Sequence, residues 1–234
     1  MRKLLLVAGA TVAALATASV LLARADAADD AAPPPADAPR AQPTRVEDAI
    51  FAGGCFWCVE ADLEKLPGVI EAVSGYTGGH VKNPSYEDVT YLDTGHKEAV
   101  RVRYDADVID YETLVSVFLR TIDVTDDLGQ FCDKGASYRT AIFALDADQR
   151  AIAEAEIAEI EAANTVLGGV VTPVLDAGTF YRAEGYHQDY YKKNPVRYSL
   201  YRRGCGRDAR LRQIWGDDAM GRRFYSDGAQ TAQR

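Results

Sequence analysis

The sequence predicts an α+β fold in which helices pack in a layer against a mixed sheet. Apolar, strand-like runs and amphipathic, helix-like runs follow one another from residue 47 to about residue 193. Residues 97–104 alternate strictly between apolar and other side chains, as in a half-buried strand, and few runs show the pattern of a buried parallel sheet. Separate helices with few parallel-sheet signals favour a layered α+β domain.

The first predicted elements are a strand at residues 47–52, a helix at residues 55–66 and a strand at residues 69–76. The helix has apolar residues at helical spacing, and a Pro-Gly pair ends it. A glycine-rich loop then leads to a short helix that Ser85 caps, because Asp88 follows three residues later. The alternating strand 97–104 comes next.

The second half of the domain continues the same alternation of elements. We expect a helix at 111–121, a polar loop at 122–137, a strand at 138–145, a helix capped by Asp146 that runs to about 164, a strand at 170–176 and a Tyr-rich helix at 183–193. Loops as long as 122–137 are often functional. The tail beyond Gly216 is predicted to be loosely ordered.

Four segments divide the chain. Residues 1–25 resemble a secretory signal peptide, with a basic start, an apolar stretch and small residues at its end. Residues 26–45 form a Pro/Ala-rich disordered linker with five of the nine prolines. One folded domain at 46–216 and a flexible tail at 217–234 follow. We expect export to the periplasm or the medium, with an uncleaved N-terminal anchor that tethers the protein to a membrane as the alternative.

The charge of the chain argues against one class of partner. Its formal net charge is −9, and loss of the three basic and no acidic residues in 1–25 would make it more negative. A domain of this charge repels nucleic acid. The basic residues are scattered except near 192–212, which we interpret as a solvated face.

The four cysteines are Cys55, Cys58, Cys132 and Cys205. In an exported protein four cysteines ordinarily suggest two structural disulfides. A domain of this size needs no such staples, and two of the four form a Cys-x-x-Cys at a helix start, which favours redox chemistry. Structural zinc prefers two close pairs of ligands, so we expect no metal.

Cys55 lies in Gly-Gly-Cys-Phe-Trp-Cys-Val-Glu, where an apolar strand meets a helix. At a helix N-terminus the macrodipole and free N–H groups favour a thiolate, which is the nucleophilic form of cysteine. The competing interpretation is a buried structural cysteine. The two glycines before Cys55 and Trp57 after it favour the nucleophile.

A set of colinear motifs extends this interpretation. GCFWCVE is followed by LPGV, SGYTGG, NPSYEDV, TGHKEAV, YRTAIF, YHQDYY and KNP, over roughly residues 47–208. In these motifs the chain resembles the A-type peptide methionine sulfoxide reductases. The resemblance implies a two-layer α/β plait (ferredoxin-like) with a mixed, mainly antiparallel sheet and a coiled C-terminal segment. It also implies reduction of the S epimer of methionine sulfoxide, free or in peptides, without a cofactor.

The resemblance also implies the site. Cys55 is the nucleophile, and Glu98 is the acid that protonates the departing oxygen; burial would raise the pKa of this carboxyl. The implied substrate-binding residues are Phe56 and Trp57 around the methyl group, Tyr86 and Tyr138 at the oxygen, and Asp133 in the same site. Without the resemblance, core packing of the aromatics and a surface position for Glu98 are the simpler interpretations. His96 and His187 are interpreted as orienting or structural.

The thiol that resolves the Cys55 sulfenic acid is left open by the sequence. Many relatives have a resolving cysteine shortly after the Asn-Pro, where this chain has Ser199, and Cys205 comes later. We favour Cys205, on an Arg/Gly-flanked tail, with Cys58 and Cys132 as alternatives. Ser137 departs from the glutamine that relatives commonly have, which affects only details of the oxygen-binding loop.

The expected partners are oxidised proteins or free methionine sulfoxide as substrate and a thioredoxin-like reductant, and the expected state is a monomer. Two other hypotheses remain. The first is a thiol-disulfide oxidoreductase that uses the pair Cys55 and Cys58. The second is a domain without catalytic activity that contains two structural disulfides.

Overall fold

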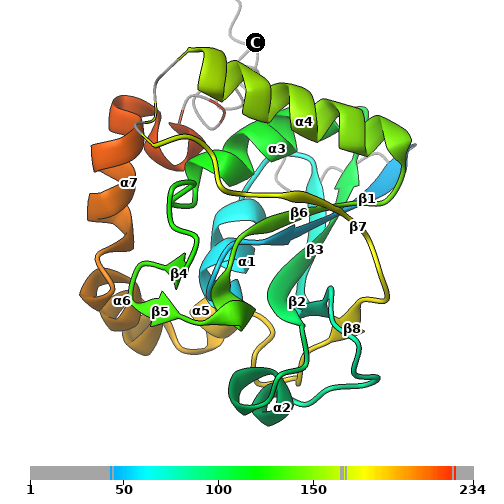
Figure 1. The fold of residues 1–234 in the computed structure, drawn as a ribbon, viewed down its shortest axis with the longest axis vertical. Helices are drawn as coiled ribbons and strands as arrows, with labels where there is room; N and C mark the ends of the chain where they lie inside the picture. Colours follow the sequence, from blue (N-terminus) through cyan, green and yellow to red (C-terminus); the bar gives the residue numbers. More distant parts are fainter. Residues whose placement is uncertain (1–42, 44, 164–165, 167, 223, 225–234) are drawn as a thin grey trace, which may run out of the picture. The chain divides into compact units, whose positions relative to one another are not determined.

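A six-stranded sheet forms the centre of the part of the chain that the structure describes (Figure 1). The structure is a computed structural model, and it describes residues 43, 45–163, 166, 168–222 and 224, all within one compact unit of residues 42–234. The sheet order is β7-β6-β1-β3-β2-β8. The strands are β1 Val46–Ala52, β2 Val69–Thr77, β3 Lys97–Asp105, β6 Ala141–Ala144, β7 Val174–Asp176 and β8 Tyr181–Arg182.

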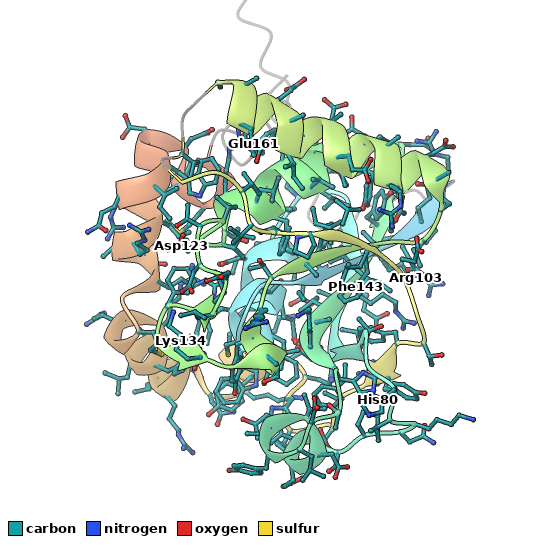
Figure 2. All side chains as sticks on the ribbon, viewed as in Figure 1. His80, Arg103, Asp123, Lys134, Phe143 and Glu161 are labelled. Carbon is teal, nitrogen blue, oxygen red and sulfur yellow. A yellow bond between two sulfur atoms is a disulfide. The ribbon has the colours of Figure 1, made fainter. Side chains whose placement is uncertain are left out.

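The sheet is mixed and mainly antiparallel, as expected. Only β6 and β7 pair in parallel, and every other neighbouring pair is antiparallel. The alternation of β3 is confirmed, because Val100, Val102 and Tyr104 are fully buried while Arg103 is exposed. Arg103 of β3 and Phe143 of β6 are labelled in Figure 2. Phe143 is buried in a small second cluster on the other face of the sheet.

Helices cover one face of the sheet and form the main core with it. These helices are α1 Phe56–Leu63, α3 Tyr111–Arg120 and α4 Ala147–Ala162 (Figure 1). Val59, Leu63 and Phe118 are at most 1% exposed against β1 and β3. Each such side chain stabilises the fold by about 1.5–3 kcal/mol through removal of apolar surface from water.

Two caps that the sequence predicts are confirmed. Before α2, Tyr86–Tyr91, the Ser85 hydroxyl accepts from the Asp88 N–H at 3.2 Å, and the Asp88 carboxylate accepts from the Ser85 N–H at 2.9 Å. Before α4, the Asp146 carboxylate accepts from the N–H of Gln149 at 2.8 Å. These side chains bond N–H groups that have no partner within the helix.

Three predicted element boundaries are wrong. The predicted strand 138–145 is only β6, because η1, a 3-10 turn at Ala136–Tyr138, precedes it. The predicted strand 170–176 is only β7. The predicted helix 183–193 is only α5, Tyr190–Lys193, because the Gln188 amide bonds Ser74 of β2 instead of a helical neighbour.

The long polar loop carries a small hairpin of its own. β4 Gly129–Gln130 pairs with β5 Asp133–Lys134. Figure 2 shows Asp123 and Lys134 on the side of the molecule that carries α7. The Arg210 guanidinium lies 2.6 Å from the Asp123 carboxylate, so the loop is joined to α7.

The prediction of a coiled C-terminal segment, which the resemblance implied, is wrong. The segment forms α6 Pro195–Gly204 and α7 Arg207–Trp215, followed by the 3-10 helix η2 Gly216–Gly221. Pro195 suits the first turn of a helix, and Gly206, with a φ of 69°, makes the bend between the two helices. The predicted boundary at residue 216 falls inside this helical segment, where Ala219 is buried.

The proposed signal peptide, nearly all of the linker and most of the tail lie outside the described residues. Among the described residues, none of the helices has the length and apolar character needed to cross a membrane.

Candidate active site

A sharp turn between β1 and α1 places Cys55 at the first helical turn. Gly54 has a φ of 80°, which favours glycine, and a side chain at Gly53 would collide with Val59 and Ile122. The buried Arg207 guanidinium donates to the Gly53 carbonyl at 3.1 Å, which fixes the turn from the side of α7. Cys55 is the N-cap residue of α1 and is 5% exposed.

The electrostatics of Cys55 differ from the expectation. Its position at the helix start is as predicted, but burial raises the pKa of the Cys55 thiol well above its ordinary value, and a hydrogen bond with Cys58 adds to this. The same hydrogen bond lowers the pKa of Cys58 to about 7, with help from the positive charges of Arg207 and Arg202. The expected preference for the thiolate at Cys55 is therefore not borne out, because burial disfavours the charged form of the thiol.

Glu98 is buried beside the nucleophile. It is 3% exposed on β3, and its carboxylate accepts from the N–H of Phe56 at 2.9 Å. Burial raises its pKa to about 8, against the lowering effect of that N–H, and the nearby Asp133 raises it further. The carboxyl is therefore mostly protonated at neutral pH, and a surface position for Glu98 is excluded.

The aromatic residues after Cys55 have different surroundings. Phe56 is 1% exposed in the main core, with its ring 4.9 Å from the ring of His187. Trp57 is partly exposed and stacks on Tyr190 at a ring distance of 3.7 Å. The Trp57 N–H donates to Nδ1 of His187 at 3.0 Å, so His187 orients the indole, as expected.

Tyr86 and Tyr138 come together near Glu98. Tyr86 begins α2 and Tyr138 ends η1, and the two phenols are close enough for each to act on the pKa of the other. Burial and the charge of Glu98 raise the pKa values of both phenols, so both keep their protons. Glu184 also holds the backbone of Tyr86 in place, because its carboxylate accepts a hydrogen bond from the Tyr86 N–H at 2.9 Å.

Asp133 reaches the site through a residue that the sequence did not identify. The Tyr201 hydroxyl of α6 donates to the Asp133 carboxylate, and its proximity lowers the pKa of the Cys55 thiol against the effect of burial. The sequence-predicted residues Cys55, Glu98, Tyr86, Tyr138 and Asp133 thus belong to one connected network of contacts and charges.

The cysteines fall into two pairs. Cys132 and Cys205 form a disulfide across 73 residues of sequence, and Cys55 and Cys58 are free and buried. The site therefore combines a thiol pair, a protonated carboxyl, two phenols and a group of packed aromatic rings. Such a site can reduce a polar oxygen centre next to an apolar group.

Comparison with known proteins identifies the family. The family model "Peptide methionine sulfoxide reductase" matches residues 47–219. This chain belongs to the peptide methionine sulfoxide reductases. A relative from Caulobacter vibrioides, "Peptide methionine sulfoxide reductase MsrA 2", is 54% identical over 77% of this chain and 91% of its own length. One from Rhizobium meliloti with the same name is 53% identical over 73% of this chain and 84% of its own length.

A solved structure agrees with this assignment. The crystal structure of Mxr1 from Saccharomyces cerevisiae in reduced form has a TM-score of 0.60 and 30% identity, and it covers 66% of this chain and 89% of that chain. As a member of this reductase family, which its residues 47–219 match, the protein reduces the S epimer of methionine sulfoxide to methionine.

Other residues of the reductase site were also missed by sequence reasoning. Tyr201, Arg207 and Glu184 act across 68 to 154 residues of sequence, and no local pattern marks such contacts. Glu60 lies in the quoted motif, yet only the structure shows that it binds Ser74 of β2 and the N–H of Asp189. The nearest sequence signal for Tyr201 is its position one helical turn before Cys205.

Proposed function

We propose that Cys55 attacks the sulfoxide sulfur while Glu98 protonates its oxygen. The supporting observation is the buried, mostly protonated Glu98 beside the thiol. The Cys55 sulfur takes the oxygen as a sulfenic acid, and the substrate leaves as the thioether, so the thiol is oxidised by two electrons and methionine sulfoxide is reduced by two. The protonated carboxyl supplies a proton in the transition state and recovers one from the thiol.

The substrate lies between the two sides of the site in this proposal. The phenols of Tyr86 and Tyr138 keep their protons and donate hydrogen bonds to the sulfoxide oxygen. The partly exposed Trp57 indole and the buried Phe56 ring supply the apolar contacts to the methyl group and the sulfur. Asp133 contributes through its hydrogen bond with Tyr201.

We propose Cys58 as the resolving thiol, in place of the Cys205 that the sequence favoured. Cys58 lies one helical turn after Cys55, both thiols are buried, and each acts on the pKa of the other. The pKa of Cys58 is lowered to about 7, so a large fraction is the attacking thiolate at neutral pH. Cys205 and Cys132 are bonded to each other. Cys58 attacks the sulfenic acid, water leaves, and a Cys55–Cys58 disulfide forms.

A dithiol protein of the thioredoxin type would reopen this disulfide. Thiol-disulfide exchange transfers two electrons from its thiols, so no metal or organic cofactor is needed for turnover. The exposed position of Cys132 makes the outer disulfide the more accessible of the two pairs. We propose a monomer that acts on peptide-bound or free methionine sulfoxide.

We also propose that the protein is exported and that the core is a ferredoxin-like plait. A stable disulfide is usual in oxidising compartments, which supports export with the signal-like residues 1–25. The strand order β6-β1-β3-β2, with α1 after the first strand and α3 after the third, supports the plait.

The test uses methionine sulfoxide with dithiothreitol as reductant. Cys55→Ser is expected to abolish this turnover. Cys58→Ser, mixed with substrate in the absence of any reductant, is expected to convert about one equivalent and to accumulate a sulfenic acid at Cys55. Turnover by Cys55→Ser would overturn the proposal. A thiol-disulfide oxidoreductase instead requires both thiols for activity on protein disulfides and shows no methionine formation.

A further inference from the structure

Two cross-links join the hairpin β4–β5 to α6, and they lie one helical turn apart. The first is the disulfide from Cys132 to Cys205. The second is the hydrogen bond from the Tyr201 hydroxyl to the Asp133 carboxylate. Cys132 and Asp133 are neighbours in sequence, and Tyr201 and Cys205 are four residues apart at the end of α6, so the two links join the same two segments.

The cross-linked tyrosine reaches the nucleophile. The Tyr201 hydroxyl donates to Asp133 and is close enough to the Cys55 sulfur to act on the pKa of the thiol, which it lowers. Its ring lies edge-on to Trp57 at a centroid distance of 5.8 Å and packs in a cluster with Cys58.

The hydroxyl has one hydrogen and two acceptors. When Cys55 is a thiol, Tyr201 donates to Asp133 and its lone pair can accept the S–H. When Cys55 becomes a thiolate, donation of the phenolic hydrogen to sulfur stabilises the negative charge. Burial raises the pKa of Asp133, so this carboxyl more readily takes a proton and releases the Tyr201 hydrogen to the sulfur.

We propose that Tyr201 is a further catalytic residue, whose hydroxyl stabilises the Cys55 thiolate, and that the Cys132–Cys205 disulfide is the clamp that holds it there. The inference rests on the proposed role of Cys55. Reduction of the disulfide adds two electrons and two protons from an external dithiol and leaves two thiols. The covalent link to the hairpin is then lost, while Tyr201 keeps its hydrogen bond to Asp133, its ring packing and the adjacent Arg202–Asp62 ion pair, and Cys55 becomes less reactive.

The test measures alkylation of Cys55 by iodoacetamide as a function of pH. In a Cys58→Ser background with the disulfide intact, Cys55 is the one free thiol among the four cysteines. Tyr201→Phe removes the hydroxyl and keeps the ring. We expect the midpoint of the pH profile to rise by about one unit, so that alkylation at pH 7 slows about tenfold.

A matched control is Tyr191→Phe. The Tyr191 hydroxyl donates to the Glu64 carboxylate, so this variant also loses a partly buried phenol–carboxylate bond near α1, but one without contact to Cys55. Its alkylation profile is expected to stay unchanged. An equal shift in both variants, or none in Tyr201→Phe, overturns the role of Tyr201.

The clamp is tested by the double variant Cys132→Ser, Cys205→Ser in the same background. We expect it to shift the midpoint in the same direction, and Tyr201→Phe added to it to produce less than half of its usual shift, because the two changes disrupt one interaction. An unchanged midpoint, or full additivity, overturns the clamp.

A second measurement avoids the serine substitutions at Cys132 and Cys205. The disulfide is reduced with a phosphine in the Cys58→Ser protein, and peptide mapping separates alkylation at Cys55 from alkylation at the outer thiols. Slower alkylation of Cys55 after reduction supports the clamp, and an unchanged rate overturns it. A Cys55→Ser enzyme that still turned over would instead overturn the proposed function, so the two failures are distinguishable.

Discussion

Burial controls the chemistry of the individual site residues. Cys55 and Glu98 are both nearly inaccessible to water, and desolvation raises the pKa of each above its ordinary value. The effect suits the acid, which keeps its proton, and opposes the nucleophile, which must lose one. The neighbouring Cys58, Tyr201 and the N–H of Phe56 supply the local polar contacts.

Glu98→Gln tests the acid. The amide keeps the size of the side chain but has no acidic proton, so kcat is expected to fall about 100-fold or more. In the unsubstituted enzyme the pKa of Glu98 is raised to about 8, so kcat should decline as pH rises through that value. Steady-state kinetics from pH 6 to pH 9 measure both effects. A Gln variant with the full rate would contradict the assignment.

The same carboxyl predicts a pH dependence of stability. Between the ordinary glutamate value and about pH 8, the folded protein holds a proton on Glu98 that the unfolded chain releases. This group's contribution to the free energy of unfolding is therefore present at low pH and is lost as pH rises through about 8. Urea unfolding at several pH values should show that the free energy of unfolding decreases less toward pH 8 in Glu98→Gln than in the unsubstituted protein. Equal slopes in both proteins would argue against a buried, protonated Glu98.

The oxygen side is tested by Tyr86→Phe and Tyr138→Phe. Each variant loses one donor to the sulfoxide oxygen, so kcat is expected to fall by about 10-fold or more for each, and further for the pair. Tyr111→Phe is the control, because its buried hydroxyl has no hydrogen-bond partner among the described residues and lies outside the site. Equal rates for all three variants would exclude oxygen binding by these phenols.

At the scale of elements, caps and turns position the site. The capping box before α2 fixes the first helical residue, which is Tyr86. The Gly53-Gly54 turn and Arg207 do the same for Cys55. Local sequence patterns therefore determine the direction in which the chain enters α1 and α2, and long-range contacts hold the two helices in place.

Ser85→Ala tests the cap. Loss of the hydroxyl is expected to lower the free energy of unfolding by about 1 kcal/mol and to raise KM, because Tyr86 is less firmly held. Urea denaturation and steady-state kinetics measure the two effects. A variant with normal stability would show that Glu184 alone is sufficient to hold α2.

The same scale shows how far sequence reasoning reaches. Strands β1 to β3, the caps at Ser85 and Asp146 and the position of Cys55 at a helix start follow from local periodicity and capping chemistry. The segment 183–193 was predicted as a helix because its polar, Tyr-rich pattern says nothing of the Gln188 bonds to β2. The disulfide and the reach of Tyr201 to Asp133 depend on tertiary contacts that no local pattern encodes.

At the scale of the whole molecule, the C-terminal helices close the site from one side. α6 brings Tyr201 to Cys55, α7 brings Arg207 to the catalytic turn, and Arg210 binds Asp123 at the start of the long loop. Cys205 lies between these helices and binds them covalently to the hairpin. The segment is therefore part of the active-site wall.

Removal of the disulfide by Cys132→Ser with Cys205→Ser should therefore weaken the whole fold. A cross-link between residues 73 apart in sequence limits the conformations that the unfolded chain can adopt. Its loss is therefore expected to lower the free energy of unfolding by about 4 kcal/mol. Urea denaturation of the double variant and of the reduced parent protein gives this difference. Unchanged stability would show that the disulfide restricts the chain little.

The most direct test of the central claim is mass spectrometry after one turnover. The enzyme, with its outer disulfide intact, is mixed with excess methionine sulfoxide and no reductant, and its disulfides are mapped by peptide digestion. We predict about one equivalent of methionine and a new Cys55–Cys58 disulfide beside the unchanged Cys132–Cys205 bond. A disulfide from Cys55 to Cys205 or Cys132, or methionine formed without oxidation of Cys55, would contradict the account.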